Sequence, residues 1–170
     1  MKTSRHPAIL PLLILAVAVV ASCGYHFPGD PGERSAVWQG TTLKIEGAGK
    51  KKHPVLAQIL KGKLAEKLGI SGKNTSNDST VTLHIDLGIP ARSLLLEDSS
   101  GRADQYQITI TAKPTITGSD KPKNYPTVSG RTTYYELIGS ATTKTARKSA
   151  ETEALGNLAD NLAAVLSSRN

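Results

Sequence analysis

The sequence contains few aromatic residues and almost no cysteine. Among its 170 residues there are one Phe, one Trp and one Cys, and aromatic residues make up 4% of the chain. A single Cys excludes an intramolecular disulfide framework and a Cys-rich zinc site. The formal net charge of +7 suggests a nucleic-acid partner, but the scarcity of aromatic side chains argues against a surface that stacks bases. Hydrophobic residues amount to 38%, which is enough for the core of one domain.

The motifs of common catalytic and metal-binding sites are also missing. The four His residues form no His-x-x-x-His or Glu-x-x-His pair that would place two metal ligands on one helix face. The sequence has no Gly-x-Ser-x-Gly elbow, no Gly-x-Gly-x-x-Gly loop and no Walker motif. We therefore expect no catalytic residue, no metal site and no enzymatic activity.

The amino-terminal residues have the pattern of a secretory signal. Lys2 and Arg5 precede an uncharged apolar run over residues 8–20, which is too short for a transmembrane helix of about 20 residues. Ala21 and Ser22 then precede Cys23, an ending that resembles a bacterial lipobox. The alternatives are an ordinary signal peptide with a chance Cys, or an uncleaved anchor. We predict a lipoprotein signal peptide over residues 1–22 and a Cys23 that carries diacylglycerol and an N-linked acyl chain.

A lipidated Cys23 would fix the location of the protein. Stable membrane anchoring needs more than one acyl chain, and a triacylated Cys meets that requirement. The two residues directly after Cys23 are Gly24 and Tyr25, and neither is an Asp that would resemble an inner-membrane retention signal. We therefore expect delivery to the outer membrane, facing the periplasm. Loss of Lys2 and Arg5 would leave 19 basic and 14 acidic side chains, a net charge of +5. Because the periplasm does not contain the genome, we expect no nucleic-acid partner.

The rest of the chain divides into a tether and one domain. Residues 23–40 are rich in Gly and Pro and are predicted to form a flexible tether. Within the domain, residues 41–170, apolar spacing predicts two amphipathic helices, over residues 54–68 and from residue 142 or 143 to about 168. Alternation predicts strands over residues 41–46, 81–87, 106–112 and 127–138. The polar or Gly-rich stretches at 47–53, 71–79, 97–104 and 118–126 are predicted to be loops.

One of these strands has an ambiguous end. The apolar residues that begin at Val81 continue past Pro90 to Leu96, where Pro90 would mark a bulge or an edge position. We favour Leu94–Leu96 as an extension of the core over an exposed surface for a partner.

The element order β-α-β-β-β-α predicts a two-layer α+β fold. We expect a four-stranded mixed sheet with both amphipathic helices on one face. A β-α-β crossover makes the first two strands parallel, and two reversals make the fourth strand parallel to the second. One end of the domain then collects two helix amino termini and three basic segments, which contain Lys50, Lys51 and Lys52, then Arg102, then Lys144, Arg147 and Lys148. This end is predicted to bind an anion, although exposed loop lysines are often only solvated.

The residues Cys23-Gly24-Tyr25-His26-Phe27, the tether and the predicted element order together resemble the LPS-assembly lipoprotein family, LptE, also called RlpB. The resemblance implies a non-enzymatic outer-membrane lipoprotein that plugs the lumen of the β-barrel LptD, assists its folding and contacts lipopolysaccharide. It also implies lipopolysaccharide binding through basic residues near the hairpin and the last helix, where this sequence has Arg102 and Lys144, with Arg147 and Lys148 beside them. Lys50, Lys51 and Lys52 are candidates from this sequence alone. The alternative is another periplasm-facing lipoprotein that acts as an adaptor in barrel-protein assembly or binds an anionic ligand.

Overall fold

A 15-residue strand, β4 (Ala103–Thr117), is the axis of the sheet in this structure, a computed structural model. The structure describes Trp38 and residues 40–70, 81–97, 103–118, 122–137 and 143–168. The predicted signal peptide, Cys23, the predicted loop at 71–79 and Arg102 lie outside these residues. At about 3.4 Å per residue, β4 is about 50 Å long, which gives it room for different neighbours along each side.

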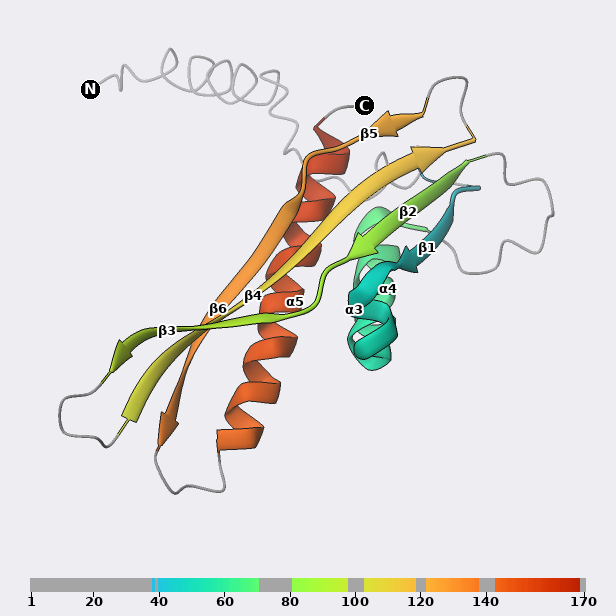
Figure 1. The fold of residues 1–170 in the computed structure, drawn as a ribbon. Helices are drawn as coiled ribbons and strands as arrows, with labels where there is room; N and C mark the ends of the chain where they lie inside the picture. Colours follow the sequence, from blue (N-terminus) through green and yellow to red (C-terminus); the bar gives the residue numbers. More distant parts are fainter. Residues whose placement is uncertain are drawn as a thin grey trace, which may run out of the picture. The chain divides into compact units, whose positions relative to one another are not determined.

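Five further strands pair with β4 or with one of its neighbours (Figure 1). β2 and β3 follow one another along one side of β4, and β5 and β6 lie along the other side, all of them antiparallel to β4. β1 pairs with β2 in parallel, as predicted from the crossover. The bounds of these strands are β1 (Thr42–Glu46), β2 (Thr82–Leu87), β3 (Ala91–Glu97), β5 (Lys123–Asn124) and β6 (Val128–Leu137).

The α+β class is confirmed, but the prediction of four strands is wrong, because the sheet has six. The predicted second strand is divided into β2 and β3 at Gly88–Pro90, although both parts follow β4. Pro90 has no N–H to donate to the ladder, which favours an interruption there. The sixth strand, β5, is a two-residue pairing within a stretch that was predicted to be a loop.

The described residues contain three helices: α3 (Gly47–Lys52), α4 (Pro54–Leu68) and α5 (Thr143–Ser167). The spans of α4 and α5 agree with the prediction, and Gly69 ends α4 in the left-handed conformation, with φ of 66°. The prediction of a loop at residues 47–53 is wrong, because α3 occupies it. Gly47 has φ of 95° and lies so close to Asp86 and the backbone of Leu87 that a Cβ atom would not fit. This packing against β2 is a tertiary effect that the local sequence does not reveal.

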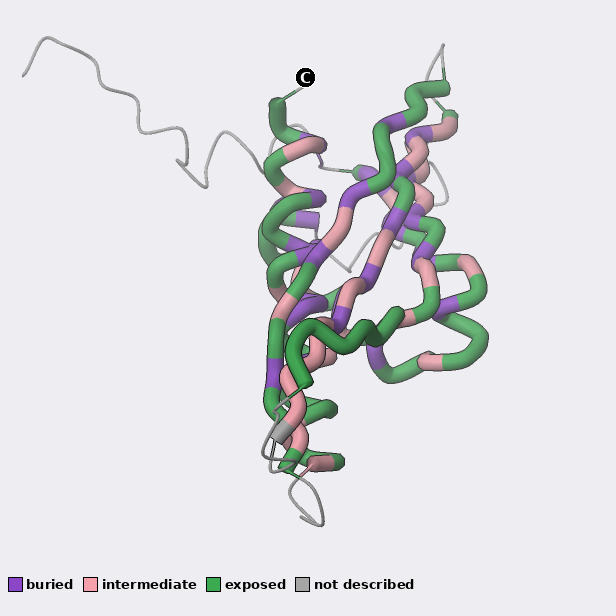
Figure 2. The backbone as a smooth tube through the Cα atoms, turned by 60° about the vertical axis from the view of Figure 1, so that its left-hand side comes forward, coloured by how far each residue is buried: buried purple, intermediate pink, exposed green. Residues whose placement is uncertain are grey.

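The two long helices cover one face of the sheet and run parallel to each other. Lys67 near the end of α4 forms an ion pair with Asp160 in the second half of α5, and the starts of both helices also lie together. Between helices and sheet lies an aliphatic core (Figure 2). Its fully buried large side chains are Leu60, Leu64, Leu68, Leu83, Ile85, Leu87, Ile108, Ile110, Leu155, Leu158, Leu162 and Leu166.

Helix α5 packs directly on the backbone of β6. A Cβ atom at Gly130 would collide with the backbone of Ala154 and Leu158, so only Gly allows this close approach. Two amides of α5 reach around the edge of the strand: Asn157 donates to the carbonyl of Arg131 at 2.8 Å, and Asn161 donates to the carbonyl of Ser129 at 2.9 Å. The edge carbonyls of β6 are therefore occupied by side chains of the same domain.

The sheet changes character along β4, and we divide it accordingly. The proximal half comprises β1, β2 and residues 110–117 of β4. The distal half comprises β3, residues 103–109 of β4 and residues 132–137 of β6. All seven residues of β3 are exposed, and Leu94, Leu95 and Leu96 are 48%, 44% and 65% exposed. The favoured interpretation of Leu94–Leu96 as an extension of the core is therefore wrong, because none of the described helices covers this edge strand.

Among the helices of the described residues, none has both the length and the apolar character needed to cross a bilayer.

Candidate functional site

A groove of about 480 Å³ lies between the start of α4 and the first turns of α5. Its volume falls in the range of sites that bind small ligands. The chain forms the groove because α3 and α4 follow β1 while α5 follows β6, and these two strands run in the same direction. The residues that line it are Lys52, His53, Pro54, Val55, Leu56, Ile59, Lys144, Arg147, Lys148, Glu151 and Thr152.

The charge of this groove is mainly positive. Four cationic side chains line it, against the single carboxylate of Glu151, which accepts a hydrogen bond from Nε of Arg147 at 3.2 Å. Lys52, Lys144 and Lys148 form no ion pair with any described residue, and all three are exposed. The N-cap of α4, His53, makes no side-chain capping bond, so the first N–H groups of that helix add to the positive potential.

One wall of the groove is apolar. Leu56 is buried and Ile59 is half-buried, whereas Val55 is 66% exposed. The exposed Val55 side chain extends the apolar surface of α4 to the opening of the groove. An apolar wall beside three unpaired lysines suits a ligand with an anionic group attached to a hydrocarbon part.

The structure brings together some of the predicted anion-binding residues and separates others. Lys52, Lys144, Arg147 and Lys148 share the groove. Lys50 lines a different cavity, next to β1, and Lys51 is exposed on α3 outside both. Helix α3 begins beside Asp86 on β2. Asp86 pairs with Lys113 of β4, and Lys113 is ten residues away from Ala103, where β4 begins. The lysine run therefore begins beside the middle of the sheet and not at its end, while Arg102 lies outside the described residues.

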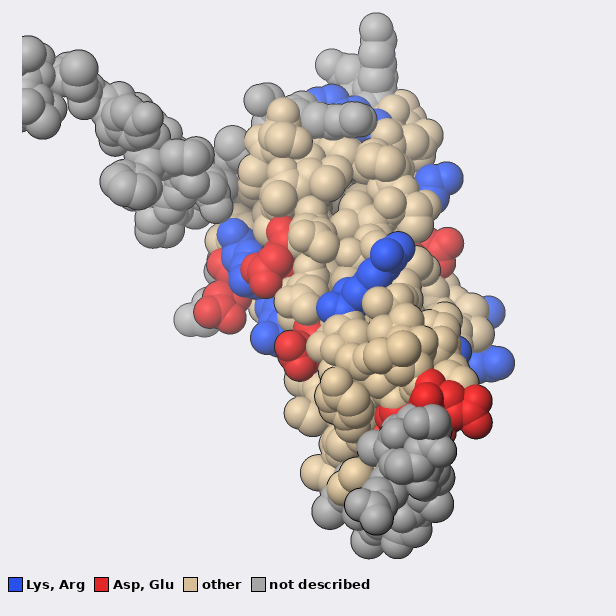
Figure 3. Space-filling view, turned by 90° about the vertical axis from the view of Figure 1, so that its left-hand side faces the viewer, with Lys and Arg blue, Asp and Glu red and all other residues tan. Residues whose placement is uncertain are grey.

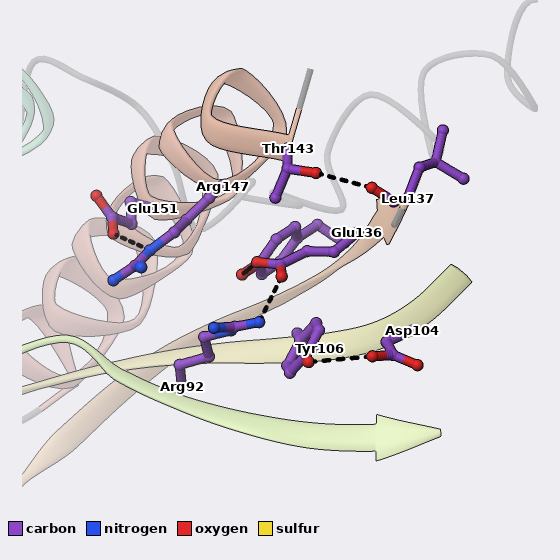
Figure 4. Close-up of polar contacts among 9 residues, drawn as sticks. Arg92, Asp104, Tyr106, Glu136, Leu137, Thr143, Arg147 and Glu151 are labelled. Carbon is purple, nitrogen blue, oxygen red and sulfur yellow. Dashed lines mark hydrogen bonds and ion pairs between the residues drawn. The ribbon is translucent and has the colours of Figure 1, made fainter. Parts of the chain in front are cut away.

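A second polar group lies next to the groove, in the distal half of the sheet (Figure 4). The guanidinium of Arg92 on β3 donates to Glu136 on β6 at 2.6 Å, and its Cζ lies 3.6 Å from the ring centroid of Tyr106. The Tyr134 hydroxyl donates to the same carboxylate at 2.6 Å, and the Tyr106 hydroxyl donates to Asp104 at 3.2 Å. The rings of Tyr106 and Tyr134 are 5.9 Å apart. We call Arg92, Tyr106, Tyr134 and Glu136 the Arg-Tyr cluster.

Burial sets the ionisation of this cluster. Desolvation, together with the hydrogen bond to Glu136, raises the pKa of Tyr134 to about 12. Partial burial also raises the pKa of Tyr106, against the opposing effect of the Arg92 charge. Both phenols are therefore neutral at physiological pH and act as hydrogen-bond donors. The cluster adds a side-chain link to the backbone pairing of β3 with β4, and Arg92 is the only β3 side chain with a polar contact among the described residues.

The Arg-Tyr cluster was not anticipated from the sequence. Its members come from three strands and meet only through the pairing of Arg92 with Ile108 and of Tyr106 with Tyr134. The available signal was the alternation that places Tyr134 and Glu136 on one face of a strand, but alternation does not say which residue lies opposite. The described residues contain no group of His, Cys, Asp and Glu side chains that would hold a metal ion.

Several solved structures share this fold. A putative lipoprotein from Caulobacter crescentus CB15 matches with a TM-score of 0.54 at 10% sequence identity, over 82% of this chain and 96% of its own. A minor lipoprotein from Acinetobacter baumannii matches with a TM-score of 0.54 at 16% identity, over 77% of this chain and 91% of its own. The rare lipoprotein B from Shewanella oneidensis matches with a TM-score of 0.54 at 15% identity, over 76% and 94%. At these identities the likeness shows the fold alone.

Comparison with curated protein sequences finds no match. The model of the family described as "LptE: Lipopolysaccharide-assembly" matches residues 40–166, which is most of the chain and all of the sheet. This family is non-enzymatic, in agreement with the expectation that the chain has no catalytic activity. The match over the whole domain shows that the chain belongs to the LptE family of lipopolysaccharide-assembly lipoproteins.

Proposed function

We propose that this chain is the plug and chaperone subunit of a lipopolysaccharide translocon. It would be anchored in the outer membrane through acyl chains on Cys23, face the periplasm and sit inside an LptD-like β-barrel whose assembly it assists. It would contact lipopolysaccharide at the groove between α4 and α5. The family supports a role in lipopolysaccharide assembly, and the observation that carries the finer proposal is the groove with its unpaired lysines and apolar wall.

The chemistry of the groove matches that of lipopolysaccharide. Lipid A carries phosphate groups next to acyl chains. Lys52, Lys144 and Lys148 would pair with phosphate oxygens, while Val55 and Ile59 would contact the first methylene groups of an acyl chain. Arg147 already bonds Glu151, so we assign it a supporting role. Lys50, Lys51 and Arg102 remain candidates for a wider contact with the glycolipid.

The sheet face opposite the helices supports a position in a barrel lumen. Its strands present mainly half-buried or exposed polar side chains: Thr82, His84, Thr109, Thr111, Thr115, Ser129 and Thr133. Hydroxyl groups donate and accept hydrogen bonds, so such a face suits the polar interior of an outer-membrane barrel.

Charge reversal tests the lipid site. We expect the triple change Lys52→Glu, Lys144→Glu and Lys148→Glu to weaken lipopolysaccharide binding by about tenfold or more at low salt, because each lost pair contributes up to about 1 kcal/mol. The control is the reversal of three exposed lysines outside the groove, Lys61, Lys113 and Lys123. Binding of labelled lipopolysaccharide by both variants is measured at two salt concentrations. Equal losses in the two variants would show that the groove is not the binding site.

Co-purification tests the plug role separately. Extraction of the full-length lipoprotein in mild detergent is expected to yield a stoichiometric complex with a large outer-membrane barrel. A lipoprotein that runs alone, while the barrel assembles normally without it, would favour the alternative of an adaptor or a free ligand binder.

A further inference from the structure

The outer edge of β3 is an exposed strand edge of the sheet. β3 is the last strand on its side of the sheet, where it pairs only with β4. Alternate N–H and C=O groups of an edge strand point away from the sheet and can pair with another strand. Every residue of β3 is exposed (Figure 2), so no described element covers this edge.

The opposite edge of the sheet shows how this domain blocks a strand. There, Asn157 and Asn161 donate to the carbonyl oxygens of Arg131 and Ser129 and so occupy edge acceptors of β6. β3 has no such cover. It contains neither Lys nor Pro, and its one cation, Arg92, points inward to Glu136 and Tyr106. Its protective features are this inward-pointing charge and a bulge between Leu94 and Leu96, and neither occupies the outward N–H and C=O groups.

An apolar surface continues from this edge across the sheet. Leu96 on β3, Gln105 on β4 and Tyr135 on β6 lie in one row through their pairing, and Leu137 follows on the same face. Leu96, Tyr135 and Leu137 are 65%, 61% and 51% exposed. With Leu94 and Leu95, the distal half holds five of the seven exposed large hydrophobic residues among those described. Leu94 lies opposite Tyr106 and therefore on the other face of the sheet, so the group on this face consists of Leu96, Tyr135 and Leu137. A group of exposed apolar side chains indicates an interaction site.

The charge beside this surface is negative. Glu97 ends β3 and lies opposite Asp104 of β4 in the strand register, and among the described residues no side chain forms an ion pair or hydrogen bond with Glu97. In Figure 3, acidic side chains lie at the lower right of the face shown and again at its left, where basic side chains lie among them. An anionic lipid surface would be repelled here, whereas a cationic group would form an ion pair with the Glu97 carboxylate.

The same charge argues against a second copy of this chain. Two β3 strands paired antiparallel about Leu94 and Leu95 would place Arg92 of one copy nearest Glu97 of the other. The Arg92 guanidinium is already bonded to Glu136 and stacked on Tyr106, so it is not available to pair with that carboxylate. The occupant that fits is a different polypeptide with its own cation.

We propose that the edge of β3 receives an extended segment of another protein, which adds a strand to the sheet. The backbone of that segment would pair with β3, an apolar side chain of the segment would contact Leu96 of the same face, and a Lys or Arg would face Glu97. This strand-addition site lies apart from the basic groove and does not depend on the proposed contact with lipopolysaccharide.

The test uses the full-length chain in a nonionic detergent and a synthetic probe peptide, Lys-Val-Thr-Val-Thr-Val-Lys. Hydrogen exchange is followed by mass spectrometry. We expect the saturating peptide to slow amide exchange in residues 91–97 by about tenfold, because newly paired amides become protected, and to leave residues 82–87 unchanged. The same peptide N-methylated at alternate residues should give no protection.

Charge variants provide the second half of the test. A peptide with Glu in place of both Lys residues should bind about threefold more weakly, as expected for the loss of an exposed ion pair. Glu97→Lys should reverse this preference, and Leu96→Ser should weaken both peptides. The proposal is overturned if the N-methylated peptide protects equally, if Glu97→Lys leaves the preference unchanged, or if no peptide protects residues 91–97. It is also overturned if residues 91–97 are protected by self-association of the chain or by phosphatidylglycerol vesicles instead.

Discussion

The proximal and distal halves of the sheet share the strand β4 but differ in what covers them. In the proximal half, Leu83, Ile85 and Ile110 lie under the two helices and are at most 1% exposed. In the distal half, the helix-facing side holds the Arg-Tyr cluster, and the edge carries exposed leucines. The comparison indicates that the proximal half provides most of the stability, while the distal half is built for contacts outside the domain.

Leucine truncation in each half should give the largest difference. We expect Leu83→Ala to lower the free energy of unfolding by about 3 kcal/mol, because it leaves a cavity in a fully buried site. Leu96→Ala removes the same atoms from an exposed site and should change the free energy of unfolding by less than about 0.5 kcal/mol. Urea denaturation followed by circular dichroism measures both. Similar losses in the two variants would contradict the division into two halves.

Tyr134 should make the stability of the distal half depend on alkaline pH. Because its folded-state pKa is raised to about 12, neutral Tyr134 stabilises the folded state fully below the unfolded pKa near 10. This contribution, up to about 2 kcal/mol, is lost as pH rises from 10 through 12. Wild type should exceed Tyr134→Phe in stability at pH 9, and the difference should shrink at pH 11.5 in urea denaturation. The exposed Tyr135 provides the control, Tyr135→Phe, which should show no such change in the difference.

The smallest difference in stability is expected between variants of two ion pairs, Arg92–Glu136 in the distal half and Lys67–Asp160 between the helices. Glu136 is 19% exposed in its side chain and accepts bonds from both Arg92 and Tyr134, so Glu136→Gln should lower the free energy of unfolding by about 1–2 kcal/mol. Asp160 is 60% exposed and pairs only with Lys67, so Asp160→Asn should have an effect of at most about 0.5 kcal/mol. Thermal unfolding at low and high salt distinguishes the two variants, because high salt should abolish the effect of Asp160→Asn before it weakens that of Glu136→Gln. A larger effect at Asp160 would reverse this ranking.

The sequence predicted the proximal half better than the distal half. Alternation located β2, and the spacing of Leu60, Leu64 and Leu68 located α4, because each pattern is local and its apolar face is buried. The extent of the distal half was missed. Leu94–Leu96 form an apolar run like that of a buried strand, and only the absence of a covering helix leaves them exposed.

The basic site shows the same limit. Topology correctly placed the starts of both long helices together, which brings Lys52 close to Lys144 and Lys148. It did not show that α3 begins beside the middle of β4, so Lys50 and Lys51 fall outside the groove. The cause is the length of β4: a strand of 15 residues is long enough for α3 to lie beside its middle, away from both ends.

Local periodicity and the handedness of a crossover were enough to predict the α+β class, the spans of α4 and α5 and the parallel pairing of β1 with β2. The formation of α3, the position of Val55 at the groove and the assembly of the Arg-Tyr cluster depend instead on tertiary packing. These features depend on close backbone packing at Gly47 and on strand register. Both are interactions between residues far apart in the sequence, and no local pattern encodes them.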